Sequence, residues 1–216
     1  MVNKTQKILI VRNDKIGDFT LILPSIVSLK KNIPNSKIVC LVSKNVEELA
    51  QQCDFIDEVI VDKKIKNLYV SLKEYKFDIA ISFFSTFRIG YLLKKLNIPL
   101  RLAPKTKLAQ IFYNHKLHQK RSKSKKPEYE YNIDLVYELF RIMNISNIKE
   151  MDLGPYLTYD YEMVSKNRID FINEYNLNPN KKIIFLHPGT GGSSKGLSLN
   201  DFGNICRGLR NFDDYN

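Results

Sequence analysis

Two short loops in this 216-residue sequence carry the side chains that could do chemistry. The first, residues 12–18, has the sequence Arg-Asn-Asp-Lys-Ile-Gly-Asp and brings two carboxylates together with a flexible glycine just before an expected helix. A carboxylate there could take a proton from a hydroxyl group as a general base, or it could cap the helix. For Asp18 the sequence favours neither the general base nor the helix cap over the other. We interpret Asp14 as a solvated acid of the loop.

The second loop, residues 187–196, has the sequence His-Pro-Gly-Thr-Gly-Gly-Ser-Ser-Lys-Gly. Backbone amides at a helix N-terminus, two kinds of hydroxyl and a lysine suit a phosphate group, and the alternative is a tight structural turn. Neither the Walker A pattern nor GxGxxG is met, because Ser194 replaces a required glycine in both and Gly196 follows Lys195. We predict a diphosphate-bearing ligand, and we interpret His187 as a strand-end histidine without a ligand.

The elements that must position these loops follow from hydrophobic periodicity. Runs rich in β-branched residues alternate with segments of helical period, which predicts strands at 8–11, 37–42, 59–61 and 79–84 and helices at 21–32, 45–52 and 65–75. This order predicts a doubly wound, Rossmann-like α/β domain with a parallel sheet. Such sheets bind ligands outside the carboxyl ends of their strands, where both loops fall.

The rest of the chain predicts a second, shorter domain. After a helix at 87–96, a short strand near Arg101, an exposed loop at 116–126 and a helix at 131–143, the Gly154-Pro155 pair breaks the chain. We therefore predict domains at 1–153 and 154–216. The second contains an expected helix at 161–175, a buried strand at 182–187 and a helix that starts at Ser198 with Asp201 three residues on. One strand and two helices cannot close an α/β domain, so we expect this domain to be truncated after its first strand-helix unit.

The net charge of +11 is concentrated in one stretch, residues 79–127, which contains twelve Lys or Arg and no Asp or Glu. Three interpretations stay open: a solvated lysine-rich face, a surface that binds another anionic molecule, and a nucleic-acid site. Nucleic acid is the least favoured, because the tyrosines flank the basic run and are not interleaved with it.

Three cysteines without metal-ligand or disulfide spacing predict a reducing, cytoplasmic compartment. The N-terminus has no signal-peptide core, and no apolar run approaches the roughly 18 residues of a membrane helix. No metal-ligand cluster is visible, so we expect neither a metal nor a cofactor.

Taken together, the two loops carry a resemblance. The first part of it is the strand Ile8-Leu9-Ile10-Val11-Arg12, then Ile16-Gly17-Asp18, then Leu23-Pro24. The second, about 170 residues later, is a strand that ends in His-Pro-Gly and leads through small polar residues to Lys195 before a helix. This pair of motifs resembles glycosyltransferase family nine, the ADP-heptose:lipopolysaccharide heptosyltransferases, over about the first two-thirds of a member.

The resemblance implies a GT-B fold with the acceptor on the N-terminal domain and the nucleotide-sugar on the C-terminal domain. It implies that Asp18 is the general base of an inverting transfer and that Arg12 and Gly17 lie on the acceptor side. It also implies that the donor diphosphate is held by four loop residues: Gly189, Thr190, Gly191 and Lys195.

The implied partners are a nucleotide-sugar, such as ADP-heptose, and an anionic glycolipid or glycan acceptor such as the lipopolysaccharide core. The implied location is the cytoplasm, with peripheral contact at the inner membrane.

The sequence departs from the family pattern in two places. Leu197 stands where the family commonly has tryptophan, and the later segment that completes the donor pocket has no counterpart in this sequence. We therefore expect little or no activity from this chain alone. The alternatives to an enzyme are a non-catalytic remnant or scaffold of the family and, with less support, an RNA-binding module.

Overall fold

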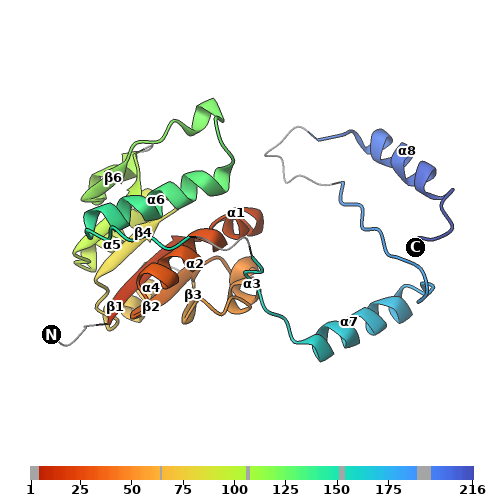
Figure 1. Cartoon of the computed structure of the whole chain (residues 1–216), viewed down its shortest axis with the longest axis horizontal. Helices are drawn as coiled ribbons and strands as arrows, with labels where there is room; N and C mark the ends of the chain where they lie inside the picture. Colours follow the sequence, from red (N-terminus) through yellow and green to blue (C-terminus); the bar gives the residue numbers. More distant parts are fainter. Residues whose placement is uncertain (1–4, 64, 106–107, 151–153, 189–195) are drawn as a thin grey trace. The chain divides into compact units, whose positions relative to one another are not determined.

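The computed structural model describes residues 5–63, 65–105, 108–150, 154–188 and 196–216 (Figure 1). The chain divides into two compact units, Met1–Thr158 and Tyr159–Asn216. The predicted domain boundary between residues 153 and 154 stays a prediction. Among the described residues, no helix is both long and apolar enough to cross a lipid bilayer.

A parallel sheet of six strands, in the order β3-β2-β1-β4-β5-β6, forms the centre of the first unit. The strands are β1 (Gln6–Arg12), β2 (Ser36–Val42), β3 (Glu58–Val61), β4 (Ile79–Ser82), β5 (Leu100–Pro104) and β6 (His115–Leu117). Ile8 of β1 lies opposite Ile38 of β2 on one side and Ile79 of β4 on the other. The predicted α/β class with a doubly wound parallel sheet is therefore confirmed.

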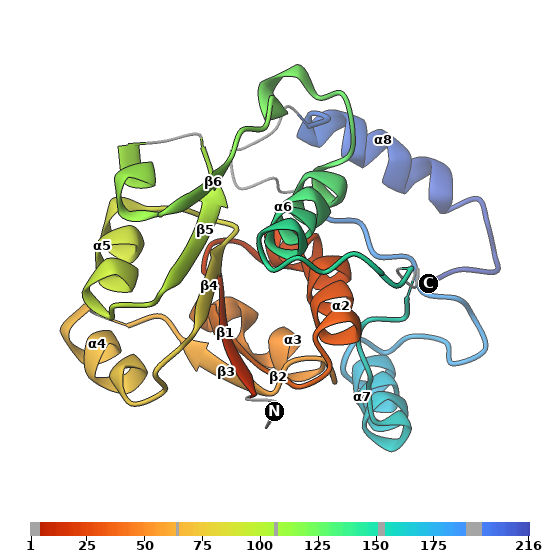
Figure 2. The ribbon, with the colours of Figure 1, turned by 60° about the vertical axis from the view of Figure 1, so that its left-hand side comes forward.

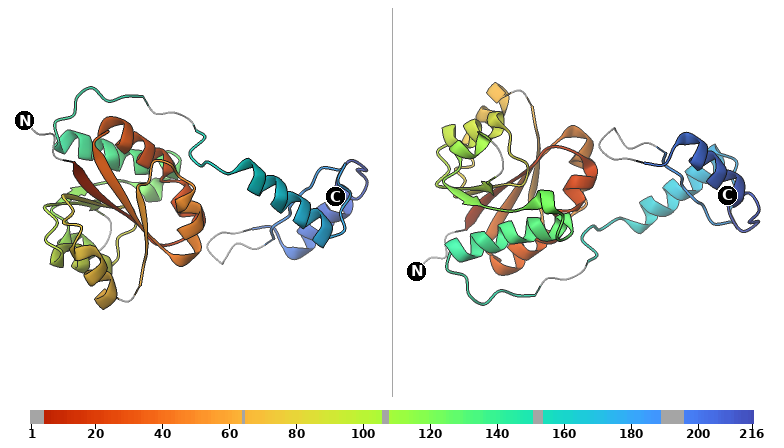
Figure 3. Two further views of the ribbon diagram at one scale, coloured as in Figure 1. Left: turned by 90° about the horizontal axis from the view of Figure 1, so that it is seen from below. Right: turned by 90° about the horizontal axis from the view of Figure 1, so that it is seen from above.

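Helices cover both faces of this sheet (Figures 2 and 3). Their bounds are α1 (Ile16–Thr20), α2 (Leu23–Asn32), η1 (Lys44–Val46), α3 (Glu47–Gln51), α4 (Ile65–Lys73), α5 (Phe87–Lys95), η2 (Leu108–Phe112), η3 (Arg121–Lys123) and α6 (Glu128–Ile142), where η marks a 3₁₀-helix. The helix expected at 21–32 is α2, with Pro24 in its first turn as expected, whereas the short helix α1 lies in the segment expected to be a loop.

The core is split by the sheet into two apolar clusters. Ile8 and Ile10 point into the cluster that α2 and α6 cover, while Leu9 and Val11 point into the cluster beneath α4 and α5. Successive side chains of a strand point to opposite faces, so a strand buried on both sides must be apolar throughout. That is why the uninterrupted apolar run of β1 predicts its central place.

The loop expected at 116–126 is exposed at most of its described residues, as predicted, but part of it is packed. It begins with the end of β6 and contains η3, and the side chain of Gln119 is only 8% exposed. Charge did not prevent packing here, because the polar groups find partners: the Gln119 amide donates to the carbonyl oxygen of Tyr131 at 2.6 Å, and Lys126 pairs with Asp134. Part of the 116–126 segment is therefore packed against the start of α6.

The second unit contains α7 (Tyr161–Glu174) and α8 (Leu199–Leu209), and both expected helices are confirmed. Ser198 and Asp201 form the predicted capping box at the start of α8. The expected buried strand at 182–187 is reduced to one parallel bridge between Lys182 and Tyr215, and Phe185 is 72% exposed. A strand is buried only where neighbouring strands and helices cover both its faces, and Ile172 is the one buried apolar side chain in the described part of this unit.

Gly90 provides a test of how tightly α5 packs on η2. A β-carbon added to Gly90 would lie 2.9 Å from Cδ2 of Phe112, closer than real contacts allow. Gly90→Ala should lower the free energy of unfolding by about 1–3 kcal/mol, measured by urea denaturation with circular dichroism. The matched control is Gly17→Ala, which meets no atom within 4 Å and should be neutral or stabilise by about 0.5–1 kcal/mol. Equal stability of the two variants would contradict this packing.

Candidate functional site

The candidate site lies where the doubly wound sheet changes direction. β1 and β4 are neighbours, and the chain leaves them toward opposite faces, through α2 and α5 respectively. A crevice outside the carboxyl ends of two such strands is the usual ligand position in this class of sheet. Here it is a cavity of about 300 Å³ lined by Arg12, Asp14, Asp18, Phe83, Phe84, Ser85, Pro104, Arg121 and Glu128.

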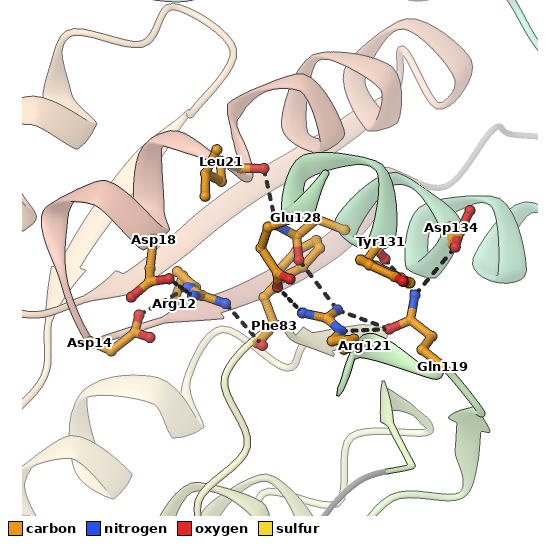
Figure 4. Close-up of polar contacts among 11 residues, drawn as sticks. Arg12, Asp14, Asp18, Leu21, Phe83, Gln119, Arg121, Glu128, Tyr131 and Asp134 are labelled. Carbon is orange, nitrogen blue, oxygen red and sulfur yellow. Dashed lines mark hydrogen bonds and ion pairs between the residues drawn. The ribbon is translucent and has the colours of Figure 1, made fainter. Parts of the chain in front are cut away.

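Arg12 is the centre of the site (Figure 4). Its side chain is only 6% exposed, and its Nη2 lies 2.8 Å from Oδ1 of Asp18 while its Nε lies 2.9 Å from Oδ1 of Asp14. Its Nη1 donates a hydrogen bond of 3.1 Å to the carbonyl oxygen of Phe83. A buried guanidinium needs such oxygens, so the last residue of β1 fixes the loop that follows it and the end of β4.

Asp14 is not the solvated acid that the sequence suggested. Its side chain is 15% exposed and is held against Arg12. Burial raises the pKa of the Asp14 carboxyl above its ordinary value, Arg12 works against that rise, and the charge of Asp18 adds to it. Asp14 therefore shares one cation with Asp18 and belongs to the structural support of the site.

Asp18 is the exposed carboxylate of the pair. It lies in the first turn of α1, but the N-cap position is Lys15, whose side chain makes no capping hydrogen bond. The capping alternative for Asp18 is therefore wrong. One of its oxygens is anchored on Arg12, and 36% of its side chain is open to solvent. An oriented and accessible carboxylate is the geometry that a general base requires.

Two further contacts hold the 12–18 loop in place. The amide of Asn13 donates to Asp62, which follows β3, at 2.6 Å, and Asp62 also pairs with Arg88 of α5. The hydroxyl of Ser43 donates to the backbone carbonyl of Asp14 at 2.9 Å. The loop is thus tied to residues that follow β2 and β3 as well as to β4.

Gly17 lies within α1 with nothing within 4 Å of the place where a β-carbon would stand. It leaves open space beside Asp18. Its assignment to acceptor binding stays a prediction.

A second arginine, which the sequence did not single out, faces the same cavity. Gln119 Oε1 accepts hydrogen bonds from Nε and Nη2 of Arg121 at 3.0 and 2.9 Å, and Glu128 pairs with Nη1. Burial lowers the pKa of Arg121. The negative charge of Glu128 raises this pKa, and the positive charge of Arg12 lowers it. The cavity therefore combines two guanidinium groups with the three carboxylates that pair with them.

Asn132 ties this second arginine to the first loop region. Its fully buried amide donates to the carbonyl oxygen of Leu21 at 3.0 Å, and its Oδ1 lies 3.4 Å from Nη2 of Arg121. The start of α6 is thereby held on the junction of α1 and α2. No local sequence pattern links Asn132 to Leu21. The one sequence signal that included Arg121 was the basic stretch, for which three interpretations were left open.

Most of the predicted diphosphate loop lies outside the residues that the structure describes. Gly189, Thr190, Gly191 and Lys195 lie outside the described residues, and their role stays a prediction. His187, at the edge of that loop, is exposed. In the described part of the chain, no group of three or more His, Cys, Asp or Glu side chains could hold a metal ion.

No protein-family model matches this sequence. A curated relative from Haemophilus influenzae, named "Putative glycosyltransferase", is 41% identical over 210 residues, which are 94% of this chain and 60% of the relative. This chain therefore spans about 60% of the length of that relative.

Solved glycosyltransferases share the fold. A glycosyl transferase of family 9 from Veillonella parvula aligns with a TM-score of 0.72 at 20% identity, over 95% of this chain and 60% of that one. ADP-heptose lps heptosyltransferase II from E. coli aligns with a TM-score of 0.76 at 18% identity, over 97% and 62%. E. coli heptosyltransferase WaaC with ADP aligns with a TM-score of 0.61 at 18% identity, over 94% and 64%. These structures have the fold that the resemblance of the sequence to family nine implies.

Removing the central arginine should unfold the site. Arg12→Met leaves the largely buried Asp14 without its cation and should lower the free energy of unfolding by about 3–5 kcal/mol, measured by urea denaturation. The matched control is Arg141→Met, which removes an exposed arginine paired with Glu138 and should leave that free energy nearly unchanged. Similar losses in the two variants would contradict the central place of Arg12.

Proposed function

We propose that this chain is the acceptor-binding part, together with part of the donor-binding portion, of a family-nine glycosyltransferase. The observation that carries the proposal is the Arg12–Asp18 pair at the carboxyl end of β1, within a fold shared with heptosyltransferases. The 41% identity to a protein named as a glycosyltransferase supports the same class of reaction.

The reaction that fits this site is an inverting sugar transfer. Asp18 takes the proton of an acceptor hydroxyl, and the hydroxyl oxygen forms a bond to the anomeric carbon of the donor sugar. The bond between that carbon and the diphosphate oxygen breaks, and the nucleoside diphosphate leaves with the electron pair. Arg12 holds the Asp18 carboxylate in one orientation through a contact of 2.8 Å, which positions the base before the acceptor arrives.

The proposed donor is a nucleotide-sugar, and ADP-heptose is the specific candidate. Two proteins with this fold are described as an ADP-heptose heptosyltransferase and as a heptosyltransferase with ADP. On this chain we assign the diphosphate to Gly189, Thr190, Gly191 and Lys195, whose amides, hydroxyl and ammonium group suit two phosphates. Positive charge beside the leaving diphosphate lowers the barrier of such a displacement, because it stabilises the negative charge that develops there.

The proposed acceptor is an anionic glycan or glycolipid, such as a lipopolysaccharide core. The cavity that contains Asp18 is flanked by the guanidinium groups of Arg12 and Arg121, which suit an anionic group beside the reacting hydroxyl. We also assign Gly17, where a β-carbon would meet no atom within 4 Å, to the acceptor side. The proposed location is the cytoplasm, at the inner surface of the membrane that holds such an acceptor.

Asp18→Asn should remove sugar transfer from the intact gene product. Asparagine keeps the shape of the side chain but cannot accept the proton, so we expect the rate to fall by about 10²–10⁴-fold in a radiolabelled sugar-transfer assay. Binding of the donor, measured by calorimetry, should not change.

The matched control for this test is Glu128→Gln. Glu128 lines the same cavity, and its side chain is as exposed as that of Asp18, at 37% against 36%. It should retain far more activity, because Glu128 pairs with Arg121 and has no base role. Full activity of Asp18→Asn, or equal losses in both variants, would contradict the assignment of the base.

Lys195→Ala tests the donor loop separately. Losing a charged hydrogen-bond donor to a diphosphate should weaken nucleotide-sugar binding by at least about tenfold, measured by calorimetry on the intact gene product. Lys166→Ala, on the exposed surface of α7, is the control and should bind normally. If the two variants bind equally well, the diphosphate lies elsewhere.

A further inference from the structure

An exposed apolar surface lies beside the candidate site, on α5 and η2. We call it the apolar platform and define it by Phe87, Tyr91, Leu108 and Ile111, which are 60%, 46%, 86% and 66% exposed. Side chains of this kind are normally buried, and a group of them on one surface marks a place that something else covers.

The four side chains form one continuous surface. The rings of Phe87 and Tyr91, one turn apart on α5, both contact the ring of Phe112 edge-on, at centroid distances of 4.7 and 6.1 Å. Leu108 and Ile111 are three residues apart on a 3₁₀-helix, where such side chains stand one above the other. Phe87 and Leu108 line the same open depression of about 960 Å³, which joins the two halves of the platform.

The platform has a rigid base. Gly90 lets α5 approach Phe112 so closely that a β-carbon would collide with its ring. Nε of Arg101 donates a hydrogen bond of 2.9 Å to the carbonyl oxygen of Phe112. The exposed side chains are therefore presented by a packed pair of helices, and their exposure is a property of the fold.

The charged residues of the sequence stretch that contains the platform are all basic. The platform lies entirely within residues 79–127, the stretch that contains twelve Lys or Arg and no Asp or Glu. Lys105 and His118 line the depression, and Lys94 lies in the last turn of α5. Among the described residues, neither Lys94 nor Lys105 has an ion-pair partner, whereas Arg88 on the same helix is neutralised by Asp62.

We infer that the apolar platform docks on an anionic phospholipid bilayer. Exposed aromatic and aliphatic side chains enter the region between headgroups and acyl chains, while the surrounding lysines meet the phosphate groups. A protein partner is less suited to this surface, because a partner that matched the apolar side chains would also have to supply carboxylates around them.

The position of the platform links membrane docking to sugar transfer, and this step of the inference rests on the proposed function. Ser85 lines both the depression of the platform and the cavity of Arg12 and Asp18, so the two hollows are neighbours. A glycan that projects from a bilayer held on the platform would then be presented close to the candidate base.

The test is co-sedimentation of the 216-residue chain with vesicles of phosphatidylcholine alone or mixed with phosphatidylglycerol. We expect binding to the mixed vesicles, with a partition coefficient about tenfold or more above that for phosphatidylcholine and a fall at high salt. The double variant Leu108→Ser, Ile111→Ser should lose about tenfold of the binding to mixed vesicles. The double variant Lys94→Ser, Lys105→Ser should lose the preference for phosphatidylglycerol.

Two controls keep the result specific. Val70→Ser combined with Tyr137→Ser removes apolar side chains that are 67% and 41% exposed outside the platform, and it should bind as the unmodified chain does. Asp18→Asn should also bind normally, so that docking is measured independently of sugar transfer. Circular dichroism must show that each variant keeps its helical content.

Three outcomes would overturn the inference. The first is an absence of binding to mixed vesicles. The second is equal binding by the platform variant and the unmodified chain, which would mean that lipid binds through charge elsewhere. The third is a dimer in sedimentation velocity that the platform variant alone abolishes while vesicle binding persists, which would assign the platform to a second copy of the chain.

Discussion

The burial of one positive charge governs the arrangement of the candidate site. Arg12 ends a strand that is apolar on both faces, so its guanidinium is drawn into the protein and must be neutralised there. Asp14, Asp18 and the carbonyl oxygen of Phe83 provide that neutralisation. Satisfying one buried cation therefore sets the course of the loop after β1, the start of α1 and the end of β4 together.

The same constraint explains why two nearby carboxylates differ. Asp14 lies inside, beneath the loop, and contributes to holding Arg12, whereas Asp18 reaches the same cation from the first turn of α1 and stays accessible. The sheet order adds a second cation to the cavity, because the chain returns through β6 and η3 and places Arg121 and Glu128 beside it. The acidic and basic groups of the cavity thus come from segments about a hundred residues apart.

Much of the fold could be predicted from the sequence, because local patterns determine it. The apolar run of β1, the position of Pro24 and the Ser198–Asp201 cap each specify an element without help from distant residues. The packing of the basic stretch could not be predicted, since it depends on contacts such as those of Gln119 with Tyr131 and of Asn132 with Leu21. In the candidate site, Asp18 and Arg12 were found from their motif, but the burial of Asp14 and the place of Arg121 depend on the completed sheet.

The central claim is that Asp18, held by Arg12, receives the proton of the acceptor hydroxyl. The most direct test is a crystal structure of the intact gene product with an unreactive donor analogue and its acceptor. The account predicts that the reacting hydroxyl oxygen lies about 2.6–3.2 Å from an Asp18 carboxylate oxygen, with the anomeric carbon on its other side. A hydroxyl that contacts Glu128 or another group instead, with Asp18 out of reach, would contradict it.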